Sequence, residues 1–82
     1  MKILPLSKRL VAYLVRCGLS GRFEKQRRLF EQNPFHPSLH TEILEPRRFR
    51  VCSFRITRTY RAVFVYLGRD AVEIIDINAH YQ

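Results

Sequence analysis

The amino-acid sequence predicts an α+β fold, in which two N-terminal helices form a hairpin packed on one face of a small, mainly antiparallel twisted β-sheet. Apolar residues in the first third of the chain recur at helical spacing, whereas those from residue 50 onward alternate with period two. Helices followed by consecutive strands are typical of an α+β sandwich. The chain has 82 residues, 46% of them hydrophobic, with neither a repeat nor a linker. Residues 1–82 should therefore form a single domain.

The first predicted elements are a short strand over residues 2–4 and a helix that begins after Ser7. The serine hydroxyl can cap a helix by accepting a hydrogen bond from a free backbone N–H. We expect the apolar residues of this helix to share one face: Leu10, Val11, Leu14 and Val15. Gly18 should end the helix, because glycine readily adopts the left-handed conformation that follows many helices.

A second helix should follow from Ser20, which we predict as its N-cap. Its apolar residues Phe23, Leu29 and Phe30 share one side. Asn33 and Pro34 should end the helix, since the residue before a proline avoids helical geometry. Residues 34–41 contain two prolines and no periodic pattern, which predicts a loop.

The rest of the chain predicts a short strand and an antiparallel meander. The short strand covers residues 42–44, and Pro46 ends it. In the next strand the alternation divides the residues between two faces, with Cys52, Phe54 and Ile56 on one and Val51, Ser53, Arg55 and Thr57 on the other. Tight turns then lead into strands over 60–67 and 72–77. The helices should cover one sheet face and leave the other partly open to solvent.

The chain is strongly basic, with 15 Lys and Arg against seven Asp and Glu and a formal net charge of +8. Such a field attracts polyanions, and nucleic acid is favoured over a membrane because no strongly apolar helix face accompanies the charge. An acidic protein partner fits equally well. No stretch approaches the roughly 20 apolar residues of a membrane span. Two unpatterned cysteines and no signal-peptide core predict a soluble, cytoplasmic protein with reduced thiols.

The first candidate functional residues are Arg55 and Arg61, which interrupt otherwise apolar strands. They are either edge charges that discourage strand pairing or a clamp that binds a phosphate bidentately. His80 and Tyr81 lie at the end of the chain and are either solvated terminal residues or catalytic ones. An imidazole moves protons near neutral pH, and a phenol donates a hydrogen bond or stacks on a base. Together, two guanidiniums, an imidazole and a phenol suit the cleavage of a phosphodiester.

Two basic segments are candidate RNA-binding surfaces. One lies in the second predicted helix and contains Arg22, Lys25, Arg27 and Arg28. The other precedes the meander and contains Arg47, Arg48 and Arg50. A merely solvated helix face would carry acidic residues at four-residue spacing, and their shortage favours contact with a polyphosphate. We expect neither a metal nor another cofactor, because Pro37 separates His36 from His40 and no further ligands join them.

Four stretches together resemble one known protein family. They are NPFHPSL, SFRI, YRAVF and EIIDINAHY, in this order along the chain. The pattern resembles the RelE/ParE superfamily of toxins from bacterial type II toxin-antitoxin modules, over essentially the whole chain from Ser7. It is most similar to the RelE-like and YoeB-like branches, which are ribosome-dependent endoribonucleases that cut messenger RNA in the decoding site. The resemblance implies a RelE-like fold.

The resemblance also implies roles for particular residues. Arg61 matches the arginine that stabilises the scissile phosphate, and Arg55 lies on the same surface. His80 and Tyr81 match the carboxy-terminal pair that takes part in proton transfer and orients the RNA. The basic helix would face ribosomal RNA. The family further implies an acidic antitoxin, whose extended segment covers this surface or adds to the sheet edge.

The general base departs from the family pattern. YoeB-like members place a glutamate in the loop after the second helix, where this sequence has Ser38, and Glu42 falls out of register. RelE-like members use lysines around the middle strands, whereas the arginines here are too basic to exchange protons readily. The base would then be His80 or His40.

The resemblance and the residues together predict a metal-independent mRNA endoribonuclease that inhibits translation and leaves 2′,3′-cyclic phosphate and 5′-hydroxyl ends. In this reaction His80 or a neighbour deprotonates the 2′-hydroxyl, Arg61 with Arg55 neutralises the developing charge, and Tyr81 positions the nucleotide. Two alternatives stay open: a ParE-like poison of DNA gyrase and a non-catalytic RNA-binding module. The His80 and Tyr81 ending argues against the gyrase poison.

Overall fold

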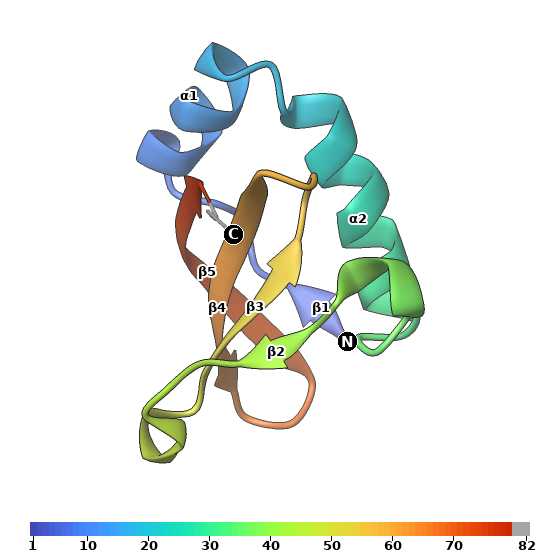
Figure 1. Cartoon of the computed structure of the whole chain (residues 1–82), viewed down its shortest axis with the longest axis vertical. Helices are drawn as coiled ribbons and strands as arrows, with labels where there is room; N and C mark the ends of the chain where they lie inside the picture. Colours follow the sequence, from blue (N-terminus) through green and yellow to red (C-terminus); the bar gives the residue numbers. More distant parts are fainter. Residues whose placement is uncertain (80–82) are drawn as a thin grey trace.

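The computed structural model describes residues 1–79, which form two α-helices and a five-stranded sheet. The helices are α1 (Lys8–Arg16) and α2 (Ser20–Gln32), and the strands are β1 (Lys2–Ile3), β2 (Glu42–Ile43), β3 (Val51–Arg55), β4 (Tyr60–Leu67) and β5 (Ala71–Ala79). The strand order is β1-β5-β4-β3-β2. Figure 1 shows the two helices together on one side of the sheet. The predicted α+β architecture is confirmed.

The predicted meander is also confirmed, because β3, β4 and β5 pair antiparallel in chain order. The short strand β2 pairs antiparallel with β3 at one edge, and β1 pairs parallel with β5 at the other. In this register Arg55 lies opposite Arg61, and Arg61 lies opposite Asn78. A shift in pairing at Val63 and Phe64 marks an irregularity between β4 and β5. The register thus brings three polar residues from three strands into one row.

The two helices begin in different ways. Ser7 caps α1 as predicted, since its Oγ accepts a hydrogen bond from the Leu10 N–H at 3.3 Å. The predicted cap at Ser20 was wrong: α2 begins at Ser20, and its N-cap residue is Leu19, whose apolar side chain cannot accept a hydrogen bond. Leu19 is buried and therefore holds the start of α2 by packing. Gly18 separates the helices with φ +68°, a conformation that glycine adopts without strain.

The core lies between the helices and the sheet and is centred on three phenylalanines. The ring of Phe30 on α2 lies 5.1 Å from the ring of Phe54 on β3 and 5.1 Å from that of Phe64 on β4, and none of the three is exposed. Aromatic pairs at this separation add to the free energy of burial. The predicted inward set Cys52, Phe54 and Ile56 is confirmed as buried.

One predicted helix face is narrower than expected. Leu10 and Leu14 are buried, but Val11 and Val15 are 48% and 66% exposed. Each step along a helix turns the side chain by about 100°, so the two valines are rotated away from the sheet. Only a stripe of α1 therefore contributes to the core.

The loop after α2 is more ordered than predicted. It contains a 3₁₀ helix, Pro37–Leu39, and Leu39 within it is fully buried. A second unpredicted 3₁₀ helix, Arg47–Phe49, joins β2 to β3 and projects from the end of the sheet away from the helices (Figure 1). Among residues 1–79, no helix of either kind is long and apolar enough to cross a membrane.

Replacing Phe30 by Ala should lower the free energy of unfolding by about 3–5 kcal/mol, because the change empties the centre of the core. A domain of this size has a total stability of roughly 4–12 kcal/mol, so the loss is a large fraction. Val15→Ala is the control and should shift it by less than about 0.5 kcal/mol, since Val15 is exposed. Urea denaturation followed by circular dichroism measures both; equal losses would contradict this description of the core.

Candidate active site

Arg61 stands out because its guanidinium is held inside the sheet face that the helices do not cover. The residue is only 5% exposed. Its Nε donates a hydrogen bond to Ser53 Oγ at 2.9 Å, and its Nη2 donates to the His40 carbonyl at 2.5 Å and the Ser53 carbonyl at 3.3 Å. Arg61 lies on the sheet face that the helices leave uncovered, where the sequence placed it with Arg55, but its side chain is buried there and not open to solvent. The buried position is possible because three oxygens offset part of the cost of removing the cation from water.

Arg61 nevertheless keeps donors for a ligand. A guanidinium has five N–H donors, and within residues 1–79 those of Nε and Nη2 are used, which leaves both N–H groups of Nη1. Arg55 lies directly opposite on β3 and is half-buried, and its side chain has no hydrogen-bond or ion-pair partner among the described residues. Burial lowers the pKa of Arg61, and the nearby charge of Arg55 lowers it further. Two adjacent cations in these conditions favour an anion as ligand.

A small hollow of about 180 Å³ opens beside the Arg61 guanidinium. The residues that line it come from β2, β3, β4, β5 and the residue after β2: Glu42, Leu44, Ser53, Arg61, Val63 and Asn78. The carboxylate of Glu42 raises the pKa of Arg61 and so opposes part of the effect of burial. Cation, carboxylate and amide thus surround one space.

Glu42, and not Ser38, supplies the carboxylate of this site. Glu42 pairs with Ser53, so both side chains point to the sheet face that carries Arg61. Ser38 instead lies in the 3₁₀ helix, where its Oγ is 3.0 Å from His36 Nδ1. The resemblance to YoeB-like members had placed Glu42 out of register with their loop glutamate. The position of a two-residue edge strand follows from its pairing with β3, which the spacing of the loop does not reveal.

The other candidate bases are placed less directly. His40 contributes its backbone carbonyl to Arg61, while the residue is exposed and adopts the left-handed conformation with φ 46°. The predicted pair His80 and Tyr81 lies outside the described residues, so their roles stay predictions. The described part of β5 ends at Ala79, which pairs with Tyr60.

Sequence reasoning missed Ser53 and Asn78 as members of the site. The alternation on β3 did put Ser53 on the same face as Arg55, and that signal was available. Asn78 was beyond the predicted end of the last strand, and only the β4–β5 pairing places it opposite Arg61. No cluster of three or more metal-binding side chains occurs among residues 1–79.

The predicted basic surface on α2 divides into exposed cations and one structural cation. Arg22, Lys25 and Arg28 are exposed. Arg27 instead donates to Glu24 Oε2 at 2.9 Å and to Glu31 Oε1 at 2.6 Å. The other oxygen of Glu31 accepts a hydrogen bond from the Ile3 N–H at 3.0 Å. Arg27 therefore helps to hold β1 on α2, and three of its five N–H donors are engaged with carboxylates.

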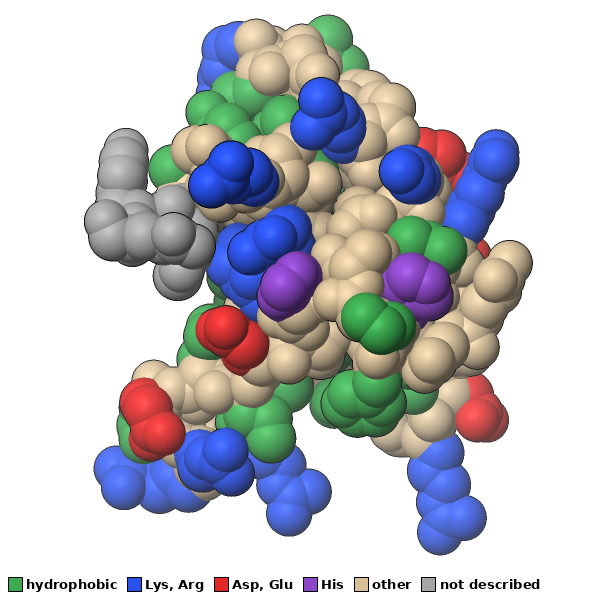
Figure 2. Space-filling view, turned by 45° about the vertical axis from the view of Figure 1, so that its right-hand side comes forward, with side chains coloured by type: hydrophobic (Ala, Val, Ile, Leu, Met, Phe, Trp, Pro, Cys, Tyr) green, Lys and Arg blue, Asp and Glu red, His purple; other side chains and the backbone are tan. Residues whose placement is uncertain are grey.

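The second predicted basic cluster, Arg47, Arg48 and Arg50, lies on the turn between β2 and β3 and is exposed to solvent. This cluster precedes β3, whereas Arg55 is the last residue of β3, so the two lie at opposite ends of the strand. Arg47 Nε lies 3.8 Å from Glu45 Oε1. Because both side chains are exposed, this ion pair contributes little to the stability of the fold. Figure 2 shows that Lys and Arg side chains are spread widely over one face of the molecule, with few acidic groups among them.

The comparisons with known proteins establish the fold. A scan against protein-family models finds no match, and a search of curated proteins finds none. Among solved structures, the chain has the fold of the YoeB/ParE toxin from Agrobacterium tumefaciens, with a TM-score of 0.72 and 23% sequence identity. The similarity covers 99% of this chain and 100% of that toxin. The predicted RelE-like fold is therefore confirmed.

Ser53→Ala should lower the free energy of unfolding by about 1–3 kcal/mol, because the Arg61 Nε loses its acceptor in a buried position. Ser20→Ala is the matched control, since Ser20 is exposed and its side chain makes no hydrogen bond within residues 1–79, and it should have an effect below about 0.5 kcal/mol. Chemical denaturation measures both variants. If Ser53→Ala is as stable as the wild type, the bond from Arg61 does not hold the two strands as described.

The ion pairs on α2 should make stability depend on acidity. Arg27 donates to the carboxylate of Glu24 and thereby lowers the pKa of Glu24. A carboxylate whose pKa is lowered by folding stabilises the protein above its unfolded pKa of about 4.3, and this contribution is lost as the pH falls through the folded value. The midpoint of thermal unfolding should thus fall more between about pH 5 and pH 3 in the wild type than in Glu24→Gln. Glu73→Gln, an exposed change on β5, should follow the wild type; the opposite order would contradict the assignment.

Proposed function

We propose that this chain is the toxin of a type II toxin-antitoxin module and acts as a metal-independent endoribonuclease on mRNA in the ribosome. The observation that carries the proposal is the Arg61 guanidinium, which is fixed by Ser53 and His40 with Nη1 unused by the described residues, next to Arg55 and Glu42. The fold of a YoeB/ParE toxin supports it.

The geometry suits the transition state of phosphodiester cleavage. When a 2′-oxygen attacks phosphorus, negative charge grows on the phosphoryl oxygens, and a preorganised donor that is already desolvated stabilises that charge well. Arg61 needs no reorganisation, because three of its hydrogen bonds hold its plane before substrate binds. Arg55 adds a second positive charge from the neighbouring strand.

We assign the general base to Glu42, since it is the only carboxylate that lines the hollow beside Arg61 within the described residues. Glu42 takes the proton of the 2′-hydroxyl, the oxygen attacks the adjacent phosphorus, and the bond to the 5′-oxygen breaks. The leaving oxygen receives a proton from His80, while Tyr81 positions the nucleotide. The products are a 2′,3′-cyclic phosphate and a 5′-hydroxyl. This assignment replaces His80 and His40 as base and keeps His80 and Tyr81 in the roles that the family resemblance implies.

The charge of the chain supports the proposed partners. A formal charge of +8 suits the ribosome and mRNA, and the exposed cations of α2 lie on the helix side of the sheet, away from Arg61. A large RNA would contact both sides by extending around the β2 edge. An acidic antitoxin is the proposed protein partner, and binding only the folded toxin would stabilise this small domain. Because translated mRNA is the proposed substrate, the proposed location of the protein is the cytoplasm.

The name of the similar toxin joins YoeB to ParE, so a poison of DNA gyrase is the second candidate function. The third is an RNA-binding module without catalysis. A gyrase poison acts by protein contact and has no need of a carboxylate beside Arg61. The juxtaposition of Glu42 and Arg61 therefore favours the nuclease.

Arg61→Lys should slow cleavage of a translated message by about 10²- to 10³-fold, because lysine keeps the charge but cannot bind Ser53, His40 and a phosphate together. Glu42→Gln should slow it by about 10²- to 10⁴-fold through loss of the base. Arg69→Ala is the control, since this exposed residue lies in the β4–β5 turn. The measurement is primer extension in a reconstituted translation system, with His80→Ala tested in parallel.

Wild-type cleavage rates in Arg61→Lys and Glu42→Gln would refute the assigned roles. The same purified protein added to gyrase and supercoiled DNA separates the two candidate toxins. Linear DNA together with an intact message would identify the gyrase poison, whereas a cut message and intact DNA would support the nuclease.

A further inference from the structure

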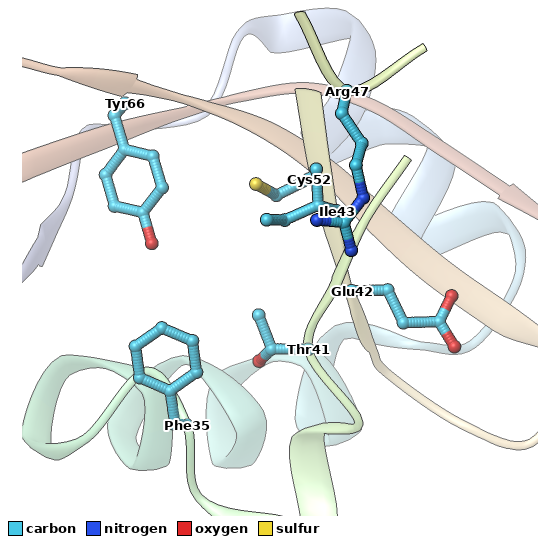
Figure 3. Close-up of a pocket in the computed structure, with 7 residues that line it drawn as sticks. All are labelled: Phe35, Thr41, Glu42, Ile43, Arg47, Cys52 and Tyr66. Atoms are coloured by element: carbon cyan, nitrogen blue, oxygen red, sulfur yellow. The ribbon is translucent and has the colours of Figure 1, made fainter. Parts of the chain in front are cut away.

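A second, larger hollow lies beyond β2 from Arg61, on the helix side of the sheet. It has a volume of about 470 Å³, and its lining is Phe35, Thr41, Glu42, Ile43, Arg47, Cys52 and Tyr66. An adjoining hollow of about 380 Å³ shares four of these residues and adds Arg50. Figure 3 shows the rings of Phe35 and Tyr66 on opposite sides of one open space. Glu42 lines both this hollow and the one beside Arg61, so the two adjoin at β2.

Phe35 is exposed to solvent, and the loop that carries it is fixed by hydrogen bonds. The residue is 72% exposed and contributes nothing to the core. Its N–H donates to Asn33 Oδ1 at 3.0 Å, and Thr41 Oγ1 donates to the Pro34 carbonyl at 2.5 Å. Leu39, fully buried, fixes the other side of the loop. An exposed aromatic ring on a fixed support is preorganised for contact with a ligand.

Tyr66 is likewise held in place. Its ring makes a T-shaped contact with the buried Phe64 ring, with 5.7 Å between the centroids, and the residue is 39% exposed. Burial raises the pKa of Tyr66, so its phenol stays a neutral hydrogen-bond donor at physiological pH. The wall opposite Phe35 thus offers both a ring and a donor.

The charges around the hollow select the kind of ligand. Arg47 and Arg50 contribute to its lining, and Arg48 is on the same exposed turn. Among the lining residues Glu42 is the one acid. Aromatic rings for stacking and guanidiniums for the backbone are the combination with which proteins bind single-stranded nucleic acid without reading its sequence.

We infer that this hollow binds one nucleobase of single-stranded RNA, stacked on Phe35 and Tyr66, with flanking phosphates held by Arg47 and Arg50. The choice of RNA over another polyanion rests on the proposed function. A strand that crosses the β2 edge next to Glu42 has a base in this hollow and a phosphate at Arg61. The two rings and the two arginines then add affinity for the substrate without taking part in the chemistry, which is left to Glu42 at the shared edge of the two hollows.

The test uses a probe that cannot be cleaved. A short 2′-O-methyl oligoribonucleotide containing 2-aminopurine, whose fluorescence is quenched by stacking, is titrated with the full chain at low salt. Phe35→Ala and Phe35→Leu should weaken binding by about 5-fold or more and abolish the quenching, because stacking requires a ring. Tyr66→Leu should do the same. Phe35→Tyr should behave as the wild type.

Phe49→Ala is the matched control. Phe49 is 62% exposed and lies beside the same arginines, but it does not line the hollow. It should quench and bind like the wild type. Wild-type affinity and quenching in Phe35→Leu would overturn the inference, as would a wild-type protein that binds the probe without quenching; the hollow would then suit an apolar side chain of a protein partner.

The experiment also separates this inference from the proposed function. Ring-dependent quenching by a protein that leaves translated mRNA intact would support the base-binding hollow and refute the nuclease. Normal cleavage with unchanged KM in Phe35→Ala, together with no quenching by the wild-type protein, would refute the base-binding hollow and leave the nuclease supported.

Discussion

The structure on the side of the sheet away from the helices depends on the burial of one guanidinium. Arg61 is 5% exposed, and it is stable there because Ser53 and the His40 carbonyl accept its hydrogen bonds. These bonds join β4 to β3 and to His40, two residues before β2. Removal of a cation from water is costly unless its donors are bonded. The same bonds that offset this cost also fix the direction of Nη1, which is the requirement of an anion-binding group.

The two faces of the sheet have different tasks. The helix side contains the phenylalanine core, and it contributes most of the hydrophobic stabilisation. The opposite side carries Arg55 and Arg61 as direct neighbours, an arrangement that opposes stability because like charges repel. A core on one face thus supports a charged arrangement on the other that would not be stable alone, and such local cost is common at functional sites.

The edge strand β2 connects these two faces. Although it has only two residues, Glu42 points toward Arg61 while Ile43 lines the hollow with Phe35 and Tyr66. Successive side chains of a strand point to opposite faces, so one short strand serves both hollows. The hollow next to the arginines of the following turn and the hollow next to Arg61 therefore adjoin at β2. A single strand of RNA passing over β2 would meet both groups of cations.

The sequence by itself determined the class and order of the elements and the inward faces of β3 and α2. Periods of 3.6 and 2 are local properties, and Phe30, Phe54 and Ile56 followed them. Arg55 and Arg61 also stood out locally as cations in apolar strands. Tertiary structure decided the rest: that Arg61 is buried, that Arg27 binds Glu24 and Glu31, and that Glu42, Ser53 and Asn78 surround one space. These contacts depend on strand register and on partners distant in sequence, and no pattern within a short window contains either.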